Sequence, residues 1–70
     1  MKVELWNNNP AAVEATDRTI RALPGNGRLE RDADDQVLFD QDGFANVIAD
    51  DFGFLGFALR TQGYVKSVIQ

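Results

Sequence analysis

Hydrophobic and polar residues alternate at the start of the chain. In residues 2–6 (KVELW), Val3 and Leu5 fall on one side, and Lys2, Glu4 and Trp6 fall on the other. This period of two is typical of a strand with one buried face. The polar stretch NNNP that follows it predicts a loop.

The pattern then changes to a helical period over residues 10–23. Apolar positions recur every three or four residues at Val13, Thr16, Ile20 and Leu23, and the solvent side is expected to carry Glu14, Asp17, Arg18 and Arg21. Asn9 followed by Pro10 is a typical helix start, because asparagine caps the first turn and proline needs no hydrogen bond there. Pro24 cannot continue the helix, so we expect it to end before that residue.

Three further runs predict strands. Residues 28–32 (RLERD) and 36–40 (QVLFD) are separated by three turn residues and are consistent with a hairpin. Residues 64–69 (YVKSVI) are rich in β-branched side chains and predict a last strand. Gly63 lies directly before them, at a position where helices commonly end on glycine.

The remaining segment, residues 41–62, fits two structures. One is a helix with Asp42 as its N-cap, whose apolar face would carry Phe44, Val47, Ile48, Phe52, Leu55 and Leu59. The other is a hairpin, because Asp42-Gly43 is a common turn pair and residues 44–49 are mediocre helix formers that suit an extra strand. Residues 51–62 are predicted to be helical in either case.

These elements predict one α+β domain over residues 1–70, since a chain of this length does not divide into two. In the first interpretation the order is β-α-β-β-α-β. A four-stranded antiparallel sheet then carries two helices on one face, which is the two-layer, ferredoxin-like arrangement. The alternative order is β-α-β-β-β-α-β, with the extra strand at residues 44–49.

Aromatic residues mark two candidate contact surfaces. On the second helix, Phe52, Leu55 and Leu59 would face the sheet, with Phe54 and Phe57 at the flanks. Either the whole apolar face lies on the sheet, or one flank, at Phe54 or Phe57, stays exposed and packs on a partner. The helix-facing side of the sheet would carry Val3, Leu5, Leu29, Val37, Phe39, Val65 and Ile69. The open side would carry Trp6, Leu38, Tyr64 and Val68 among Glu4, Glu30 and Lys66. Alternatively, Trp6 and Tyr64 pack under loops. Exposed aromatic side chains often anchor a protein partner.

Charge is distributed unevenly along the chain, although the net charge is only −4. Residues 30–51 contain eight carboxylates and one base, Arg31, whereas the rest of the chain contains three carboxylates and six bases. Asp32, Asp34 and Asp35 are the densest part of this acidic segment. It is expected to repel nucleic acid and to attract basic protein surfaces. Clustered aspartates are also typical of turns and helix caps.

The residue types exclude several chemistries. The chain has no cysteine and no histidine, so it can form neither a disulfide nor a Cys/His zinc site. No hydroxyl group has a recognisable general base beside it. Asp40, Asp42 and Gly43 partly resemble a calcium loop, but Leu38 and Ala49 fill two essential ligand positions. We therefore expect no catalytic residue, no metal and no cofactor.

The sequence thus predicts a small, acidic, non-catalytic protein-binding module that self-associates and acts as an adaptor or inhibitor. Its expected partner is a protein with a basic surface, and neither nucleic acid nor a membrane is expected to bind. The chain shows no signal peptide and no apolar run of roughly 20 residues, which favours the cytoplasm. Two alternatives stay open: a small-molecule-sensing regulatory domain, and an inhibitor that mimics nucleic acid.

Overall fold

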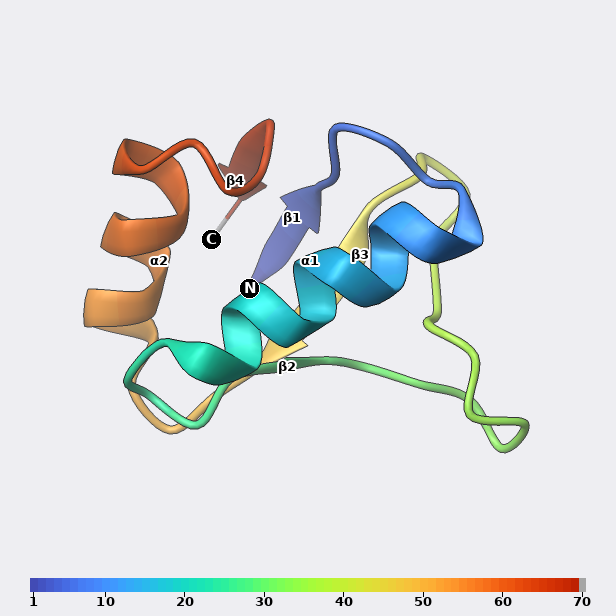
Figure 1. The fold of residues 1–70 in the computed structure, drawn as a ribbon, viewed down its shortest axis with the longest axis horizontal. Coiled ribbons are helices and arrows are strands. Elements are labelled where there is room, and N and C mark those ends of the chain that lie inside the picture. Colours follow the sequence, from blue (N-terminus) through green and yellow to red (C-terminus); the bar gives the residue numbers. More distant parts are fainter. Residues whose placement is uncertain (70) are drawn as a thin grey trace.

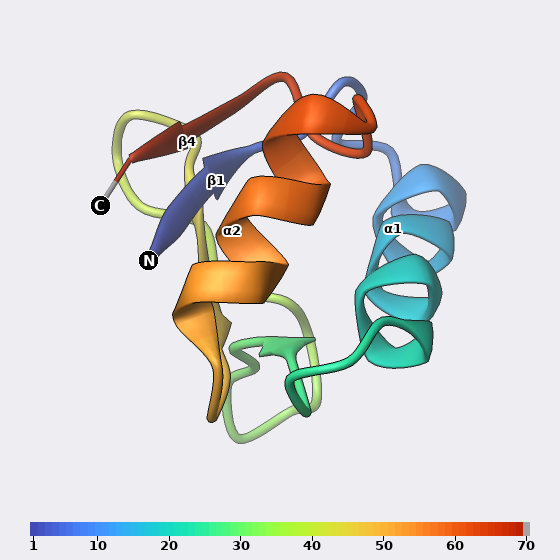
Figure 2. The ribbon, with the colours of Figure 1, turned by 90° about the vertical axis from the view of Figure 1, so that its left-hand side faces the viewer.

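The computed structural model describes residues 1–69 (Figure 1). The elements follow the order β1 (Lys2–Glu4), α1 (Pro10–Ala22), β2 (Arg28–Leu29), β3 (Ala45–Ile48), α2 (Phe52–Thr61) and β4 (Ser67–Ile69). The predicted β-α-β-β-α-β order is therefore confirmed. Both helices lie on one side of the sheet, which gives a two-layer α+β fold (Figure 2).

The sheet has the strand order β2-β3-β1-β4, and every neighbouring pair is antiparallel. In the register of the central strand β1, Val3 lies opposite Ala45 of β3 and Val68 of β4. At the β2 edge, Leu29 lies opposite Val47 of β3. Directly opposed side chains share a face of the sheet. These residues therefore form the layer that faces the helices, in the ferredoxin-like arrangement.

Residues 44–49 are extended and contain β3. The helix expected to begin at Asp42 is therefore wrong, and the extended alternative for this segment is confirmed. A turn reverses the chain before β3: the Gly43 N–H donates to the Asp40 carbonyl at 3.0 Å, and Gly43 has a φ of 85°. The Asp40 carboxylate also accepts the N–H groups of Asp42 and Phe44, each at 2.9 Å. Asp42 thus belongs to a turn and caps no helix.

The predicted strand at residues 36–40 is present only as two isolated bridges, one from Val37 to Arg31 and one from Phe39 to Ala45. The third strand of the sheet is β3 instead. The reason is that β3 is the segment that pairs with the central strand β1, and a strand needs such a neighbour to complete its hydrogen bonds.

Residues 30–40 form a projection that we call the arm, which leaves the sheet at the edge strand β2 and returns to β3 (Figure 1). At its base, the Glu30 N–H donates to the Asn46 carbonyl of β3, and the Leu38 N–H donates to the Glu30 carbonyl, both at 2.9 Å. The arm is therefore a short extension of the sheet edge.

The core lies between the sheet and the helices. Its buried side chains are Val3, Leu5, Val13, Ile20, Leu29, Ala45, Val47, Leu55, Leu59 and Val65. Gly27 lies between Ile20 of α1 and Leu55 of α2: a Cβ there would overlap the Leu55 side chain and would lie 3.0 Å from Ile20 Cγ2. The packing of the chain at residue 27 between these two side chains therefore depends on glycine.

Both ends of α2 are capped by its own neighbours in the chain. Asp51 Oδ1 accepts the Phe54 N–H at 3.1 Å, which satisfies a backbone donor of the first turn. Gly63 follows the helix with a φ of 72°, and the Tyr64 N–H donates back to the Leu59 carbonyl at 3.1 Å. The predicted glycine at the C-terminal cap is confirmed.

The first turn of α2 packs differently from the prediction. Phe52 was expected in the inward stripe with Leu55 and Leu59, but it is 41% exposed, whereas both leucines are buried. Gly25 lies against Asp51 and Leu55 at this end of the helix. The backbone of the α1–β2 turn therefore covers the first turn of α2, and Phe52 remains outside.

The predicted faces of the last two strand residues are reversed. Val68 lies opposite Val3 and packs against the core, whereas Ile69 lies opposite Lys2 and is exposed. Residues 64–66 are bends and do not belong to β4. The alternation of buried and exposed residues that was predicted from Val65 to Ile69 therefore does not continue into β4. The buried position in the strand is Val68, one residue before the predicted Ile69.

Candidate functional site

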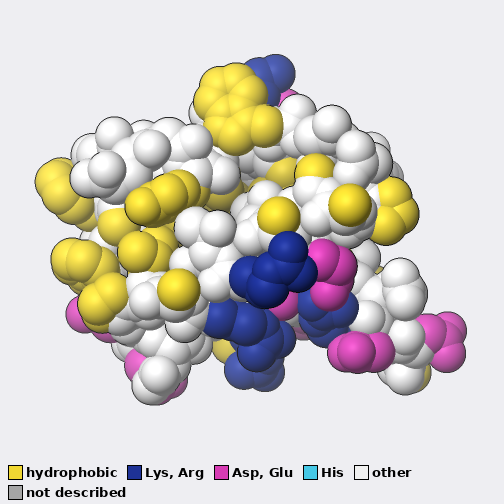
Figure 3. All heavy atoms as spheres, viewed as in Figure 1, with side chains coloured by type: hydrophobic (Ala, Val, Ile, Leu, Met, Phe, Trp, Pro, Cys, Tyr) yellow, Lys and Arg dark blue, Asp and Glu magenta, His cyan; other side chains and the backbone are white. Residues whose placement is uncertain are grey.

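The outward face of α2 carries large apolar side chains. Phe57 is 61% exposed and Phe54 is 47% exposed. The two residues are three apart, so they lie about 60° apart around the helix. The opposite side of α2 contributes Leu55 and Leu59 to the core. Hydrophobic side chains accordingly gather over α2, at the left of the molecule (Figure 3). Both phenylalanines are exposed, so the apolar face of α2 does not lie entirely on the sheet.

Trp6 is 66% exposed. Its indole Nε1–H donates to the Gly63 carbonyl at 3.1 Å, which holds the ring against the loop after α2. This loop also contains Tyr64, whose side chain is exposed. The prediction that Trp6 and Tyr64 lie on the open face of the sheet is therefore wrong. The reason is that β1 ends at Glu4 and β4 begins only at Ser67.

The open face of the sheet has a depression of about 360 Å³. Its lining residues are Lys2, Glu30, Leu38, Phe39, Asp40, Phe44 and Asn46. Leu38 is exposed here, as predicted. Lys2 Nζ lies 2.7 Å from Asp40 Oδ2. This hydrogen bond raises the pKa of Lys2 and lowers the pKa of Asp40. The depression thus combines apolar side chains with one ion pair.

The aspartates of the arm are divided between a turn and solvent. Asp32 Oδ1 accepts the N–H groups of Asp34 and Gln36 at 2.9 and 3.0 Å, which holds the tip of the arm in a tight turn. The side chains of Asp34 and Asp35 are exposed at this tip. Asp34 and Asp35 are therefore accessible to a partner, and Asp32 shapes the turn that presents them.

The aromatic face of α2 and the arm lie at opposite ends of the longest dimension of the molecule, which is 28 Å (Figure 1). Exposed charges are largely screened beyond about 8 Å at physiological ionic strength. The sequence pattern did not determine the distance between the aromatic residues of α2 and the acidic segment. The structure places them on two separate surfaces, so the charges of the arm act at a different contact from the phenylalanines.

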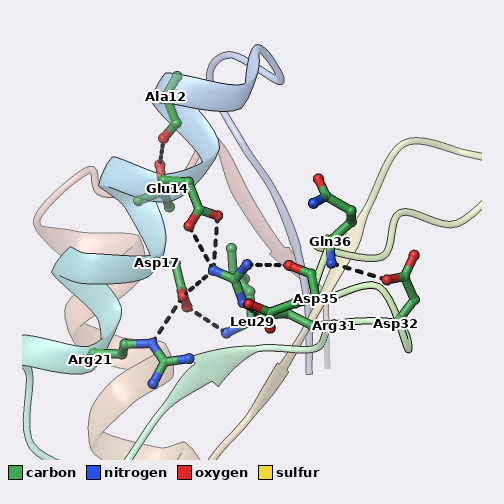
Figure 4. A network of polar contacts seen from close by, with 10 residues as sticks. Ala12, Glu14, Asp17, Arg21, Leu29, Arg31, Asp32, Asp35 and Gln36 are labelled. Atoms are coloured by element: carbon green, nitrogen blue, oxygen red, sulfur yellow. Dashed lines mark hydrogen bonds and ion pairs between the residues drawn. The ribbon is translucent and has the colours of Figure 1, made fainter.

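A buried ion cluster that sequence reasoning missed centres on Asp17 of α1 (Figure 4). Asp17 was expected on the solvent side of the helix, but it is only 3% exposed. Its carboxylate accepts hydrogen bonds from the Leu29 N–H, from Arg21 Nε and from Arg31 Nη2, each at 2.9 Å. These bonds connect α1 to β2 and to the base of the arm.

The surroundings of Asp17 keep it ionised. Burial by itself would raise the pKa of this carboxyl group, but the hydrogen bonds from Leu29, Arg31 and Arg21 outweigh burial and lower the pKa. Within residues 1–69, no buried side-chain nitrogen or oxygen lacks a hydrogen-bond partner, and no group of three acidic side chains could hold a metal ion. We call the cluster of Asp17, Arg21, Leu29 and Arg31 the clamp, because its bonds join α1 to β2 and to the base of the arm.

Arg31 extends this clamp into the arm. Arg31 Nη2 also lies 2.8 Å from Glu14 Oε2, and Arg31 Nη1 donates to the Asp35 carbonyl at 2.8 Å. The hydrogen bonds to Asp17 and Glu14 raise the pKa of Arg31. The four-residue spacing of Asp17 and Arg21 could have indicated their pairing on the helix. Nothing local could have indicated the burial of Asp17, which depends on β2.

No family model, curated protein or solved structure matches this chain. Among the helices of residues 1–69, none is both long enough and apolar enough to cross a membrane. The structure offers three candidate binding surfaces: the apolar face of α2, the depression on the open sheet and the acidic tip of the arm.

Proposed function

We propose that this chain is a small, non-catalytic protein-binding module of the cytoplasm, an adaptor or inhibitor that contacts its partner through the outward face of α2. The observation that carries the proposal is the exposure of Phe54 and Phe57 on the side of the helix opposite the core. Trp6 extends this surface beyond the C-terminal end of α2, through its bond to Gly63.

The energetics of these side chains support the proposal. Burying one exposed phenylalanine in an interface contributes about 1.5–3 kcal/mol, and aromatic anchors dominate the binding energy of many protein interfaces. Phe57 belongs to no part of the core, so a polar residue there would leave the fold intact. A large apolar residue at this position is therefore better explained by a contact outside the chain.

The arm supports a second contact, with a basic protein surface. Asp34 and Asp35 are exposed at its tip, and the bonds of Arg31 to Asp17 and to the Asp35 carbonyl hold that tip in place. Charges placed in this way favour the encounter and orientation of a basic partner. Mimicry of nucleic acid has less support, because Asp32 and Asp40 are bonded to backbone N–H groups and are not presented to solvent as a row of charges.

Affinity capture from a lysate of the native cells tests the proposal, with the wild-type chain and Phe57→Ser as baits. We expect Phe57→Ser to lose the proteins that the wild type enriches, with an unchanged circular dichroism spectrum. Leu38→Ser is the matched control, because it removes an exposed apolar side chain from the open sheet face. Retention of the same proteins by both variants would contradict the proposal.

Small-molecule sensing is a second candidate function, favoured by the depression on the open sheet face. Its volume of about 360 Å³ falls in the range of about 300–1,000 Å³ for ligand pockets. Leu38 and Phe44 supply apolar lining, and the Lys2–Asp40 pair could orient a polar group. A metabolite screen should then find a compound that raises the unfolding temperature of the wild type and not of Leu38→Asp. A screen without such a compound would count against this function.

A further inference from the structure

We propose that the protein-binding face of α2 pairs with the same face of a second copy of this chain, in antiparallel orientation. This inference depends on the proposed function of that face and names its occupant. The first observation is the position of Gly53, which lies one helical turn before Phe57 on the outward side and is exposed. A Cβ at Gly53 would meet only Asp51 Oδ1, at 3.5 Å, so the helix has a notch there.

An antiparallel pair matches this notch with an aromatic side chain. We place the two-fold axis of the dimer at the level of residue 55 along α2. Gly53 and Phe57 then lie on either side of this axis. Each is about 3 Å from it along the helix, because the rise is about 1.5 Å per residue. Phe57 of one copy then lies over Gly53 of the second copy, and the same contact repeats on the other side of the axis. A contact of this kind is self-complementary, as two-fold symmetry requires.

The charges at the ends of α2 are complementary in the same register. Arg60 is the basic residue of the last turn, and Asp50 lies just before the helix with an exposed side chain. Arg60 lies in the last turn of α2 and Asp50 just beyond its other end, so antiparallel pairing about position 55 brings Arg60 of one copy to the Asp50 end of the second copy, twice per dimer. Parallel pairing would place Arg60 opposite Arg60. Among residues 1–69, no carboxylate forms an ion pair with Arg60 in the single chain.

Two polar groups on this face are already bonded within the chain. The Thr61 hydroxyl donates to the Phe57 carbonyl at 2.8 Å, and the Phe54 N–H is bonded to Asp51. Covering the face therefore leaves these two donors satisfied, which avoids the penalty of burying an unpaired polar group. The dipoles of two antiparallel helices also attract each other.

The size of the contact indicates a reversible dimer. The accessible surface of the chain is 4357 Å². A standard stable interface buries about 800 Å² per partner, roughly a fifth of this surface. A helix of 10 residues is only about 15 Å long and buries less than that. We therefore expect dimers that form at high protein concentration and dissociate on dilution.

Sedimentation equilibrium with charge-reversed variants tests the pairing. The wild type should show a concentration-dependent monomer–dimer equilibrium. Asp50→Arg and Arg60→Glu should each weaken self-association by at least about tenfold, because each homodimer then has two like-charge pairs. An equimolar mixture of the two variants should restore association, because the mixed dimer has one Arg–Asp pair and one Arg–Glu pair of opposite charge. The weakening by each single variant is specific to the antiparallel register, because a parallel pair already has two like-charge contacts in the wild type.

Two controls separate charge position from other effects. Arg18→Glu makes the same charge change as Arg60→Glu at an exposed site on α1, and it should leave self-association unchanged. Asn26→Gly removes the 2.9 Å bond from Asn26 Nδ2 to Asp50 without changing charge, and glycine tolerates the φ of 53° at this position. This variant should also leave self-association unchanged. A monomeric wild type, or a mixture that associates no better than either variant alone, would overturn the proposal.

The same results distinguish this inference from the proposed function. If the wild type is a monomer while Phe57→Ser still loses captured proteins, the second copy is the wrong occupant and the binding face remains supported. If Phe57→Ser neither loses captured proteins nor weakens self-association, both the binding face and the dimer are wrong.

Discussion

Asp17 connects three parts of the chain through one carboxylate. The side chain belongs to α1, its partner Leu29 belongs to β2, and its partner Arg31 begins the path into the arm. Buried carboxylates are rare unless they are paired and hydrogen-bonded. Here the bonds from Leu29 and Arg31 come from segments that the fold brings near, so the cluster requires the correct packing of α1 on β2.

Replacement of Asp17 should therefore be among the most damaging changes to stability. We expect Asp17→Ala to lower the free energy of unfolding by about 3 kcal/mol, because the buried Leu29 N–H and the two arginines lose their common acceptor. Urea titration of the variant and the wild type measures this difference. Glu14→Ala is the control: Glu14 also pairs with Arg31 but is half exposed, so its loss should cost about 1 kcal/mol or less. Equal costs for the two variants would contradict the role of the buried clamp.

Replacement of Gly53 should increase stability, in contrast to replacement of Asp17. Gly53 lies within α2, and the space that a Cβ would occupy there is open. Gly53→Ala is expected to stabilise the chain by about 0.5–1 kcal/mol, since alanine restricts the unfolded backbone and favours the helix. Thermal unfolding at low protein concentration measures the effect on the single chain. Gly63→Ala is the matched control and should destabilise by about 1 kcal/mol, because Gly63 has a φ of 72°. A destabilising Gly53→Ala would mean that the site is more crowded than the structure shows.

Among the elements, the arm has the least support from neighbouring structure. Its base uses the backbone bonds of Glu30 and Leu38, and its tip is held by Arg31, which reaches the Asp35 carbonyl from the Asp17 cluster. By contrast, β1 is paired on both sides, with β3 and β4. Local opening is favoured where few contacts oppose it. The arm should therefore open before the sheet does.

Arg31→Gln should loosen the arm while leaving the sheet intact. We expect faster amide hydrogen exchange at Leu38 and Gln36, because the guanidinium no longer holds the tip, and unchanged exchange at Val47, which bonds to the Met1 carbonyl. Exchange followed by NMR measures both sites in one experiment. Lys2→Gln removes the ion pair with Asp40 at the base of the arm and should leave exchange at Gln36, near the tip, unchanged. Uniformly faster exchange would show instead that Arg31 supports the whole fold.

For the molecule as a whole, pH should affect stability mainly at the acidic and alkaline extremes. The chain has no histidine. The folded pKa of Asp17 lies below its ordinary value of 3.8, so its stabilising effect is present above that value and is lost as pH falls through the folded pKa. The pKa of Lys2 is raised above 10.5, so its contribution is present below that value and is lost as pH rises through the folded pKa.

Unfolding temperature should therefore be nearly constant between about pH 6 and pH 9 and should fall steeply below about pH 4. The measurement is thermal unfolding by circular dichroism across this range. In Asp17→Asn the acidic fall should be shallower, because the group with the lowered pKa is gone. An equally steep fall in this variant would assign the acid sensitivity to other carboxylates.

The sequence by itself determined the elements whose signals are local. Asn9 and Pro10 set the start of α1, Gly63 ended α2, and the spacing of Leu55 and Leu59 identified the buried side of that helix. The same spacing placed Phe54 and Phe57 at the flanks of α2. These features depend on residues within one or two turns of each other, so they can be derived without the rest of the chain.

Only the tertiary structure decided the features that depend on distant segments. Residues 44–49 suit helix and strand about equally, and pairing of β3 with β1 makes them a strand. The burial of Asp17 depends on Leu29 and Arg31, and the exposed position of Trp6 depends on the loop at Gly63. In each case the deciding contact joins residues more than ten positions apart, and a local pattern carries no information about such contacts.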